Sequence, residues 1–161
     1  MTRSNNVKHK GAKPKLSLAH RRKARRLILQ ALYQWQIAKT ETQEITKQFR
    51  EENPGKVDWD YFEEVFSEIP KQVSILDAYL QPLLDRHPDA LDPIERALLY
   101  LGTFELANRV DVPFRVVINE SVELAKVFGA TGSHKYINGV LDKLVATLRP
   151  LELGDKRASS P

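Results

Sequence analysis

The apolar residues of this chain recur at helical spacing over most of its length, and this pattern restricts the fold more than any other feature. Between residues 24 and 148 they fall three or four positions apart, which places them along one side of successive helices. No segment of four to eight residues alternates apolar and polar side chains as a half-buried strand does. With 42% hydrophobic residues among 161, the chain can build its own core. The sequence therefore predicts an all-α protein folded as a compact helical bundle.

Turn and capping residues divide this pattern into separate helices. Asn53-Pro54-Gly55 is a strong turn signal, and Asp58 is expected to cap the helix that follows. Pro70 predicts a kink or break in that helix. Asp92-Pro93-Ile94-Glu95 predicts a helix start in which Asp92 and Glu95 cap each other reciprocally. Ser133 is expected to cap the last helix. Helices are thus expected at about 24–38, 41–52, 59–83, 93–108, 114–128 and 133–149.

The helix expected at 93–108 contains two residues that need an explanation. Gly102 in its middle costs about 1 kcal/mol relative to alanine, which suggests that a neighbouring backbone passes close to it. Glu105 lies on the apolar side, four positions before Arg109. An ion pair between these two residues is a better interpretation of Glu105 than a role as an acid catalyst.

The order of these segments predicts one helical domain between two tails. His87-Pro88 marks a joint at 85–91, so we expect a domain at 19–150 with two packed subdomains at about 19–85 and 91–150. The basic residues 1–18 are expected to form a flexible tail, and so are residues 151–161.

Positive charge is concentrated at the N-terminus. Residues 1–26 contain ten lysines and arginines and no acidic residue, whereas the remaining 135 residues contain 15 basic and 21 acidic side chains. A basic arm on a mildly acidic body indicates contact with a polyanion, of which nucleic acid is the commonest. For residues 1–15 alone, a solvated disordered tail explains the composition equally well.

The first helix carries this basic character on one face. Arg22, Arg26 and Tyr33 are offset by 0, 4 and 11 positions, so they align along one ridge opposite the apolar stripe, and we expect Leu29 on the same exposed side. Guanidinium groups beside an aromatic ring suit RNA, because the cations contact phosphates and the ring stacks on an unpaired base. The alternative is a solvated charged face with a tyrosine resting on a neighbouring helix.

Signatures of catalysis are absent from the sequence. Cysteine is missing, the four histidines are scattered, and no Gly-rich nucleotide loop or nucleophile elbow is present, so we expect no catalytic residue, metal or cofactor. No apolar run is long enough for a transmembrane helix, and no secretory signal follows the basic start. A cytoplasmic binding protein is the resulting expectation.

Several segments resemble the family of the bacterial transcription antitermination factor NusB, in register from about Ala19 to Pro150. They are Arg21-Arg22-Lys23-Ala24-Arg25-Arg26 with Gln30-Ala31-Leu32-Tyr33-Gln34-Trp35-Gln36, then Leu91-Asp92-Pro93-Ile94-Glu95-Arg96, residues 112–129, and Ser133-His134-Lys135-Tyr136 at the start of residues 133–143.

The resemblance implies both a fold and a function. The fold is all-helical with two packed subdomains. The function is to bind the single-stranded boxA element of nascent RNA, notably in ribosomal RNA leaders, as a heterodimer with the ribosomal protein NusE. That complex helps RNA polymerase to read through terminators. Together with the ridge, the resemblance predicts RNA-binding residues at Arg21, Arg22, Arg25, Arg26, Tyr33, Ser133, His134, Lys135 and Tyr136.

The sequence also departs from the family pattern and leaves alternatives open. Thr131-Gly132 stands where family members often have an acidic residue. An RNA-binding accessory domain related to the N-terminal part of RNA methyltransferases is the nearest alternative. A reader of duplex DNA is disfavoured because the basic helix precedes its neighbour rather than following it. A structural adaptor for acidic proteins also remains, as does the choice between a free monomer and a homodimer.

Overall fold

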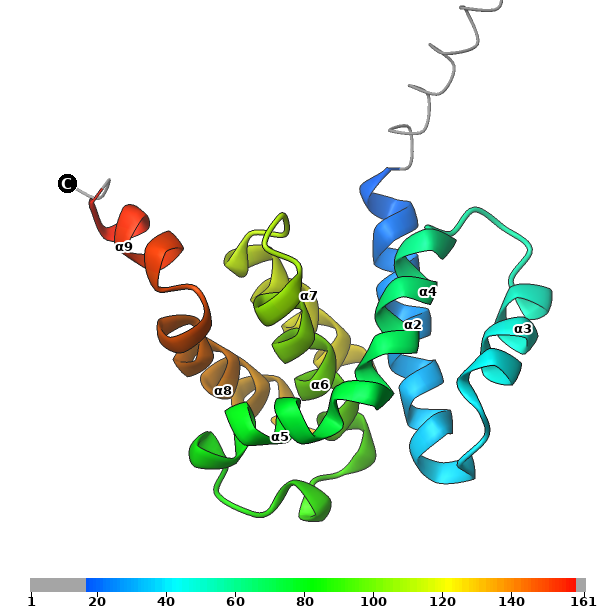
Figure 1. The fold of residues 1–161 in the computed structure, drawn as a ribbon, viewed down its shortest axis with the longest axis horizontal. Coiled ribbons are helices and arrows are strands. Elements are labelled where there is room, and N and C mark those ends of the chain that lie inside the picture. The colour runs from blue at the N-terminus through cyan, green and yellow to red at the C-terminus, as the bar shows by residue number, and fades with distance from the viewer. Residues whose placement is uncertain (1–16, 159–161) are drawn as a thin grey trace, which may run out of the picture.

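The structure is a computed structural model, and it describes residues 17–158. Within that range the elements are helices joined by turns, with no strand, which confirms the all-α fold class (Figure 1). Three short 3₁₀ turns, η2 (Ile69–Gln72), η3 (Gln81–Leu83) and η4 (Pro88–Ala90), interrupt them. The α-helices are α2 (Leu18–Ala38), α3 (Thr42–Glu52), α4 (Trp59–Glu68), α5 (Val73–Leu80), α6 (Pro93–Asn108), α7 (Phe114–Phe128), α8 (Ser133–Leu148) and α9 (Pro150–Ala158).

Helix α6 packs against the largest number of other elements, and α7 and α8 form the most extensive single pair. Helix α2 packs against α3, α4 and α6, while α6 also packs against α5, α7 and α8. Helix α6 is buried on nearly every side, as its apolar composition predicts. The buried side chains form one continuous core, so the division into two subdomains stays a prediction.

Local signals in the sequence explain where several helices begin and end. Ser17 accepts a hydrogen bond from the backbone N–H of His20, and the imidazole of His20 accepts one from Ser17, so α2 begins with a reciprocal cap. The Asp58 carboxylate caps α4 through the N–H of Tyr61, as expected. Pro70 lies in η2, which separates α4 from α5, and this confirms the predicted break.

Four local expectations were wrong. Leu29 is completely buried, because it lies one turn from Arg25 on a strip of α2 that faces α6. The group that packs closely against Gly102 is the side chain of Leu141 on α8 and not a neighbouring backbone. A Cβ added at Gly102 would lie 2.8 Å from Cδ1 of Leu141. Gly132, and not Ser133, is the residue that precedes α8. Glu95 accepts a hydrogen bond from the Ser133 hydroxyl, so its carboxylate reaches α8 instead of completing a reciprocal cap.

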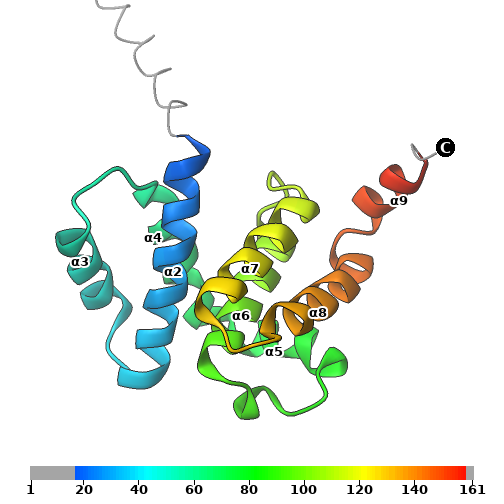
Figure 2. The same cartoon turned by 180° about the vertical axis from the view of Figure 1, so that it is seen from behind.

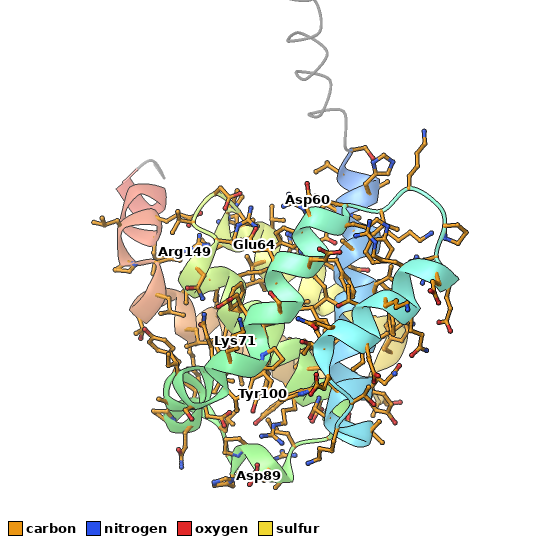
Figure 3. All side chains as sticks on the ribbon, turned by 45° about the vertical axis from the view of Figure 1, so that its right-hand side comes forward. Asp60, Glu64, Lys71, Asp89, Tyr100 and Arg149 are labelled. Carbon is orange, nitrogen blue, oxygen red and sulfur yellow. The ribbon has the colours of Figure 1, made fainter. Side chains whose placement is uncertain are left out.

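Residues 151–161 were expected to form a flexible tail, but residues 150–158 form the helix α9. Arg149, labelled in Figure 3, is buried just before this helix, and its guanidinium donates hydrogen bonds to the carbonyl oxygens of Leu106 and Val112. Glu152 of α9 pairs with Arg149 and accepts a hydrogen bond from the N–H of Phe114, the first residue of α7. Arg149 and Glu152 therefore supply hydrogen-bond partners to the backbone between the end of α6 and the start of α7, where helix termini leave polar groups without partners. Residues 1–16 of the expected N-terminal tail lie outside the described residues. The last two residues of that expected tail are not part of a tail, because Ser17 caps α2 and Leu18 is its first residue.

Candidate nucleic-acid interface

The exposed ridge of α2 has the composition that the sequence predicted. The Arg22 side chain is 65% exposed and Tyr33 is 42% exposed, and Arg26 also faces solvent. With a rise of about 1.5 Å per residue, Arg22 and Arg26 are one turn apart and Tyr33 follows two turns later. We call these three residues the α2 ridge. It offers two cations and an aromatic face along one line.

A groove between α2 and α7 borders the α2 ridge. Nε of Arg22 lies 3.0 Å from Oε2 of Glu120 on α7, although 98 positions separate them. Arg26 and Glu123 line the same groove, which has a volume of about 480 Å³ and an apolar wall of Leu124, Val127 and Phe128. The arginines therefore face carboxylates of α7 as well as solvent. The sequence pattern gave no signal for this pairing, because helical periodicity relates residues within one helix and Glu120 lies in another helix.

Two of the predicted arginines point away from the ridge. Arg25 is 3% exposed, and its Nε lies 2.8 Å from Oε2 of Glu105 on α6. Arg21 pairs with Asp58 at 2.9 Å and lies over the Tyr61 ring, 3.8 Å from its centroid. Arg25 is thus a buried structural residue rather than a surface contact. Glu105 is a paired carboxylate as expected, but its partner is Arg25 and not Arg109.

Tyr61 completes this buried cluster. Its hydroxyl donates to the same Oε2 of Glu105 that Arg25 contacts. Burial and the adjacent carboxylate both raise the pKa of the Tyr61 phenol far above its usual range. Arg109 contacts the same tyrosine, with its guanidinium 4.7 Å from the centroid of the Tyr61 ring. Arg109 also forms ion pairs with Glu64 and Asp111.

The start of α8 presents only part of the second predicted region. Ser133 is buried, and its hydroxyl donates to Oε2 of Glu95 at 2.8 Å, so it is not a surface contact. Lys135 is exposed and His134 is half-buried. The hydroxyl of Tyr136 donates to Oδ1 of Asp85 at 3.1 Å, so that ring is turned toward the loop after α5.

The first turn of α6 connects the two predicted regions. Nε2 of Gln36, near the end of α2, donates to the carbonyl oxygen of Pro93 at 3.0 Å. Two residues further on, Glu95 holds Ser133 at the start of α8. Helices α2, α7 and α8 lie next to one another on the face seen in Figure 2. The C-terminal end of α2 and the start of α8 therefore meet at one turn of α6.

The residues that the structure describes contain no group of three or more metal-ligating side chains that could hold an ion. Their helices include none with the length and hydropathy of a membrane span.

Comparison with known proteins places this arrangement in a family. Residues 22–146 match the model of the NusB family. This chain belongs to the NusB family. A transcription antitermination protein NusB from Alcanivorax borkumensis is 53% identical over 138 residues, which are 85% of this chain and 92% of that protein. The NusB protein of Pseudomonas fluorescens is 53% identical over 136 residues, covering 84% of this chain and 82% of its own length.

Solved NusB structures share the fold. NusB of T. maritima matches with a TM-score of 0.75 at 24% identity, over 83% of this chain and 96% of that one. A crystal structure of the antitermination factors NusB and NusE in complex with dsRNA matches with a TM-score of 0.74 at 24% identity, over 81% of this chain and 99% of that one.

Membership of the NusB family makes this chain a transcription antitermination factor rather than an enzyme, as the resemblance predicted. The alternative of an accessory domain related to RNA methyltransferases is not favoured, because the NusB relatives match over most of their own length.

Thr131 and Gly132, where this chain departs from the NusB pattern, form the turn that precedes α8. Gly132 has a φ of 86°, in the left-handed region that favours glycine, and it leads directly into α8. Thr131 and Gly132 are both exposed beside Lys135. This chain therefore has no carboxylate at the turn that precedes its exposed Lys135.

Proposed function

We propose that this protein binds boxA RNA of nascent transcripts together with NusE, and so helps RNA polymerase to read through terminators in the cytoplasm. The observation that carries the proposal is the α2 ridge, where Arg22 and Arg26 offer two cations and Tyr33 an exposed ring. Lysine and arginine neutralise phosphates and release counterions, while an aromatic face accepts an unstacked base.

The RNA-binding surface proposed here is narrower than the sequence suggested. It consists of the α2 ridge with His134 and Lys135 at the start of α8. Arg25 and Ser133 are left out because both are buried and bonded to glutamates of α6. Arg21 and Tyr136 are also left out, because they are only partly exposed and pair with Asp58 and Asp85, whereas the Arg22 side chain stays 65% exposed beside Glu120.

NusE is proposed as the protein partner. A structural relative with this fold is the NusB of a complex with NusE and dsRNA. Two modest basic surfaces joined in one complex raise the effective concentration of the second contact, so we expect NusE to increase the affinity for RNA.

The test is a fluorescence-anisotropy titration of labelled boxA RNA with this protein, with and without NusE. A scrambled single strand and a duplex of the boxA sequence serve as comparison ligands. We expect the single-stranded boxA RNA to bind most tightly and NusE to tighten it further. Equal binding of all RNAs, with no effect of NusE, would contradict the proposal. Sedimentation velocity of the free protein measures separately whether it is a monomer or a homodimer.

A further inference from the structure

A second groove lies on the other side of the α2 ridge, between α2 and α3. Its volume is about 550 Å³, within the range of pockets that take small molecules. Leu27 and Phe49 in its lining are buried, while Tyr33 and Ile37 are 42% and 58% exposed. The groove thus has an apolar lining and a partly exposed aromatic wall that belongs to the ridge.

The charge of this groove does not suit a phosphate. Among the described residues that line it, Glu52 is the one with a formal charge, and the others that are polar are amides and the tyrosine. A phosphate has only acceptor oxygens and a negative charge, so a carboxylate repels it. The edge of every nucleobase, in contrast, has at least one N–H group to donate to an acceptor.

The hydrogen bonds along the wall fix which atoms remain for a ligand. Because a carboxylate only accepts, Gln48 must turn its amide N–H toward Glu52, at 3.2 Å, and its oxygen toward Gln34. Gln34 then donates to that oxygen, also at 3.2 Å, and its own Oε1 is left as an acceptor. Asn53, the residue that follows α3, donates to the carbonyl of Phe49 at 2.9 Å, and its Oδ1 likewise is left as an acceptor. The groove therefore offers oxygen acceptors from α2 and from the residue at the end of α3.

We propose that the groove between α2 and α3 receives one unstacked base of the RNA strand whose phosphates contact Arg22 and Arg26. The proposal rests on the function proposed above. Arg26 and Tyr33 are seven residues apart, or about 10 Å along the helix axis, so one strand reaches from the cations into the groove. The base lies against Tyr33 and Ile37, and its N–H groups donate to Gln34 and Asn53.

The experiment measures the affinity of the full chain for a set of boxA RNAs in which each nucleotide in turn is replaced by an abasic one. The set is titrated with the wild type, with Gln34→Ala and Ile37→Ala, and with Gln43→Ala as a matched control. Gln43 is exposed on α3 and lines a separate hollow with Thr46 and Glu63. Melting curves establish that each variant is folded.

For the wild type we expect one abasic position to weaken binding about ten-fold, since stacking on an aromatic side chain is lost. Gln34→Ala weakens binding of the intact RNA about five-fold, but it has no further effect on the RNA that is abasic at that position. Ile37→Ala shows the same coupling and Gln43→Ala binds as the wild type does. If Gln34→Ala and Ile37→Ala weaken intact and abasic RNAs equally, or not at all, the pocket is refuted while RNA binding stands. A wild type that binds none of the RNAs refutes the proposed function itself.

Discussion

Arg25 of α2 and Glu105 of α6 form a buried ion pair, with Nε and Oε2 2.8 Å apart, although eighty positions separate them in the chain. Their side chains are 4% and 1% exposed. Together with the buried apolar residues of α2, the pair lies on the side of the helix that faces α6. Arg22, Arg26 and Tyr33 lie on the outer side, so Arg25 supports the orientation in which these three side chains are exposed.

Removal of Arg25 tests this division of roles. Arg25→Ala leaves the Glu105 carboxylate buried without its cation, which costs about 3–5 kcal/mol of folding free energy. Urea denaturation at pH 7 measures that loss. At a temperature where the variant stays folded, its RNA affinity should have the same salt dependence as the wild type. Arg26→Ala is the control: its stability should change little, because the side chain is exposed. A stable Arg25→Ala protein with weakened RNA binding would contradict this assignment.

The contact between Arg22 and Glu120 is expected to limit RNA binding. Glu120→Gln removes a negative charge beside the phosphates and releases Arg22 from its ion pair. We expect tighter boxA binding, by a factor of about two to five, because an exposed ion pair is worth less than about 1 kcal/mol. Surface plasmon resonance at low salt measures the change. Glu44→Gln, an exposed acid at the start of α3, is the matched control and should bind as the wild type does.

Tyr33 distinguishes recognition of a base from attraction by charge alone. Tyr33→Ala should weaken RNA binding by about 1–3 kcal/mol, since a stacking face is lost, with a nearly unchanged melting temperature. Tyr33→Phe keeps the ring and should keep most of the affinity. The salt dependence should stay the same in both variants, because no phosphate contact is lost. A Tyr33→Ala protein that binds RNA normally and melts much earlier would show that Tyr33 is a packing residue.

The raised pKa of Tyr61 predicts that the folded protein loses stability at alkaline pH. In the unfolded chain a tyrosine has a pKa of about 10, whereas burial and Glu105 raise the pKa of Tyr61 in the folded state above that value. Above pH 10 the unfolded state therefore releases a proton that the folded state retains. Stability falls with a slope approaching about 1.4 kcal/mol per pH unit from this residue. Urea denaturation between pH 9 and 11 should show a shallower decline for Tyr61→Phe, and parallel curves would count against the raised pKa.

The sequence predicted the elements of this fold better than the roles of its charged residues. The apolar spacing, the cap at Asp58 and the break at Pro70 are local properties, and the structure has all of them. The inward position of Arg25 was missed, although the spacing contains a signal for it. Arg25 precedes Leu29 by four positions and Leu32 by seven, so the three share one side of α2.

Long-range partners could not be predicted from spacing. Ser133 was expected to contact RNA, but its hydroxyl is bonded to Glu95, which lies 38 positions away in another helix. Helix α9 was missed because Pro150, a sound stop signal for α8, is also a good first residue for a new helix. The α2 ridge, in contrast, requires only the periodicity of one helix, and for that reason its exposure was predictable.

The salt dependence of boxA binding decides whether RNA lies along the α2 ridge. Each phosphate contact on a single strand contributes a slope of about 0.7 to the fall of log affinity with log salt concentration. We predict that the Arg22→Ala, Arg26→Ala double variant binds more weakly than the wild type and has a slope smaller by about 1.4. A double variant with the wild-type slope and affinity would show that RNA does not bind along the α2 ridge.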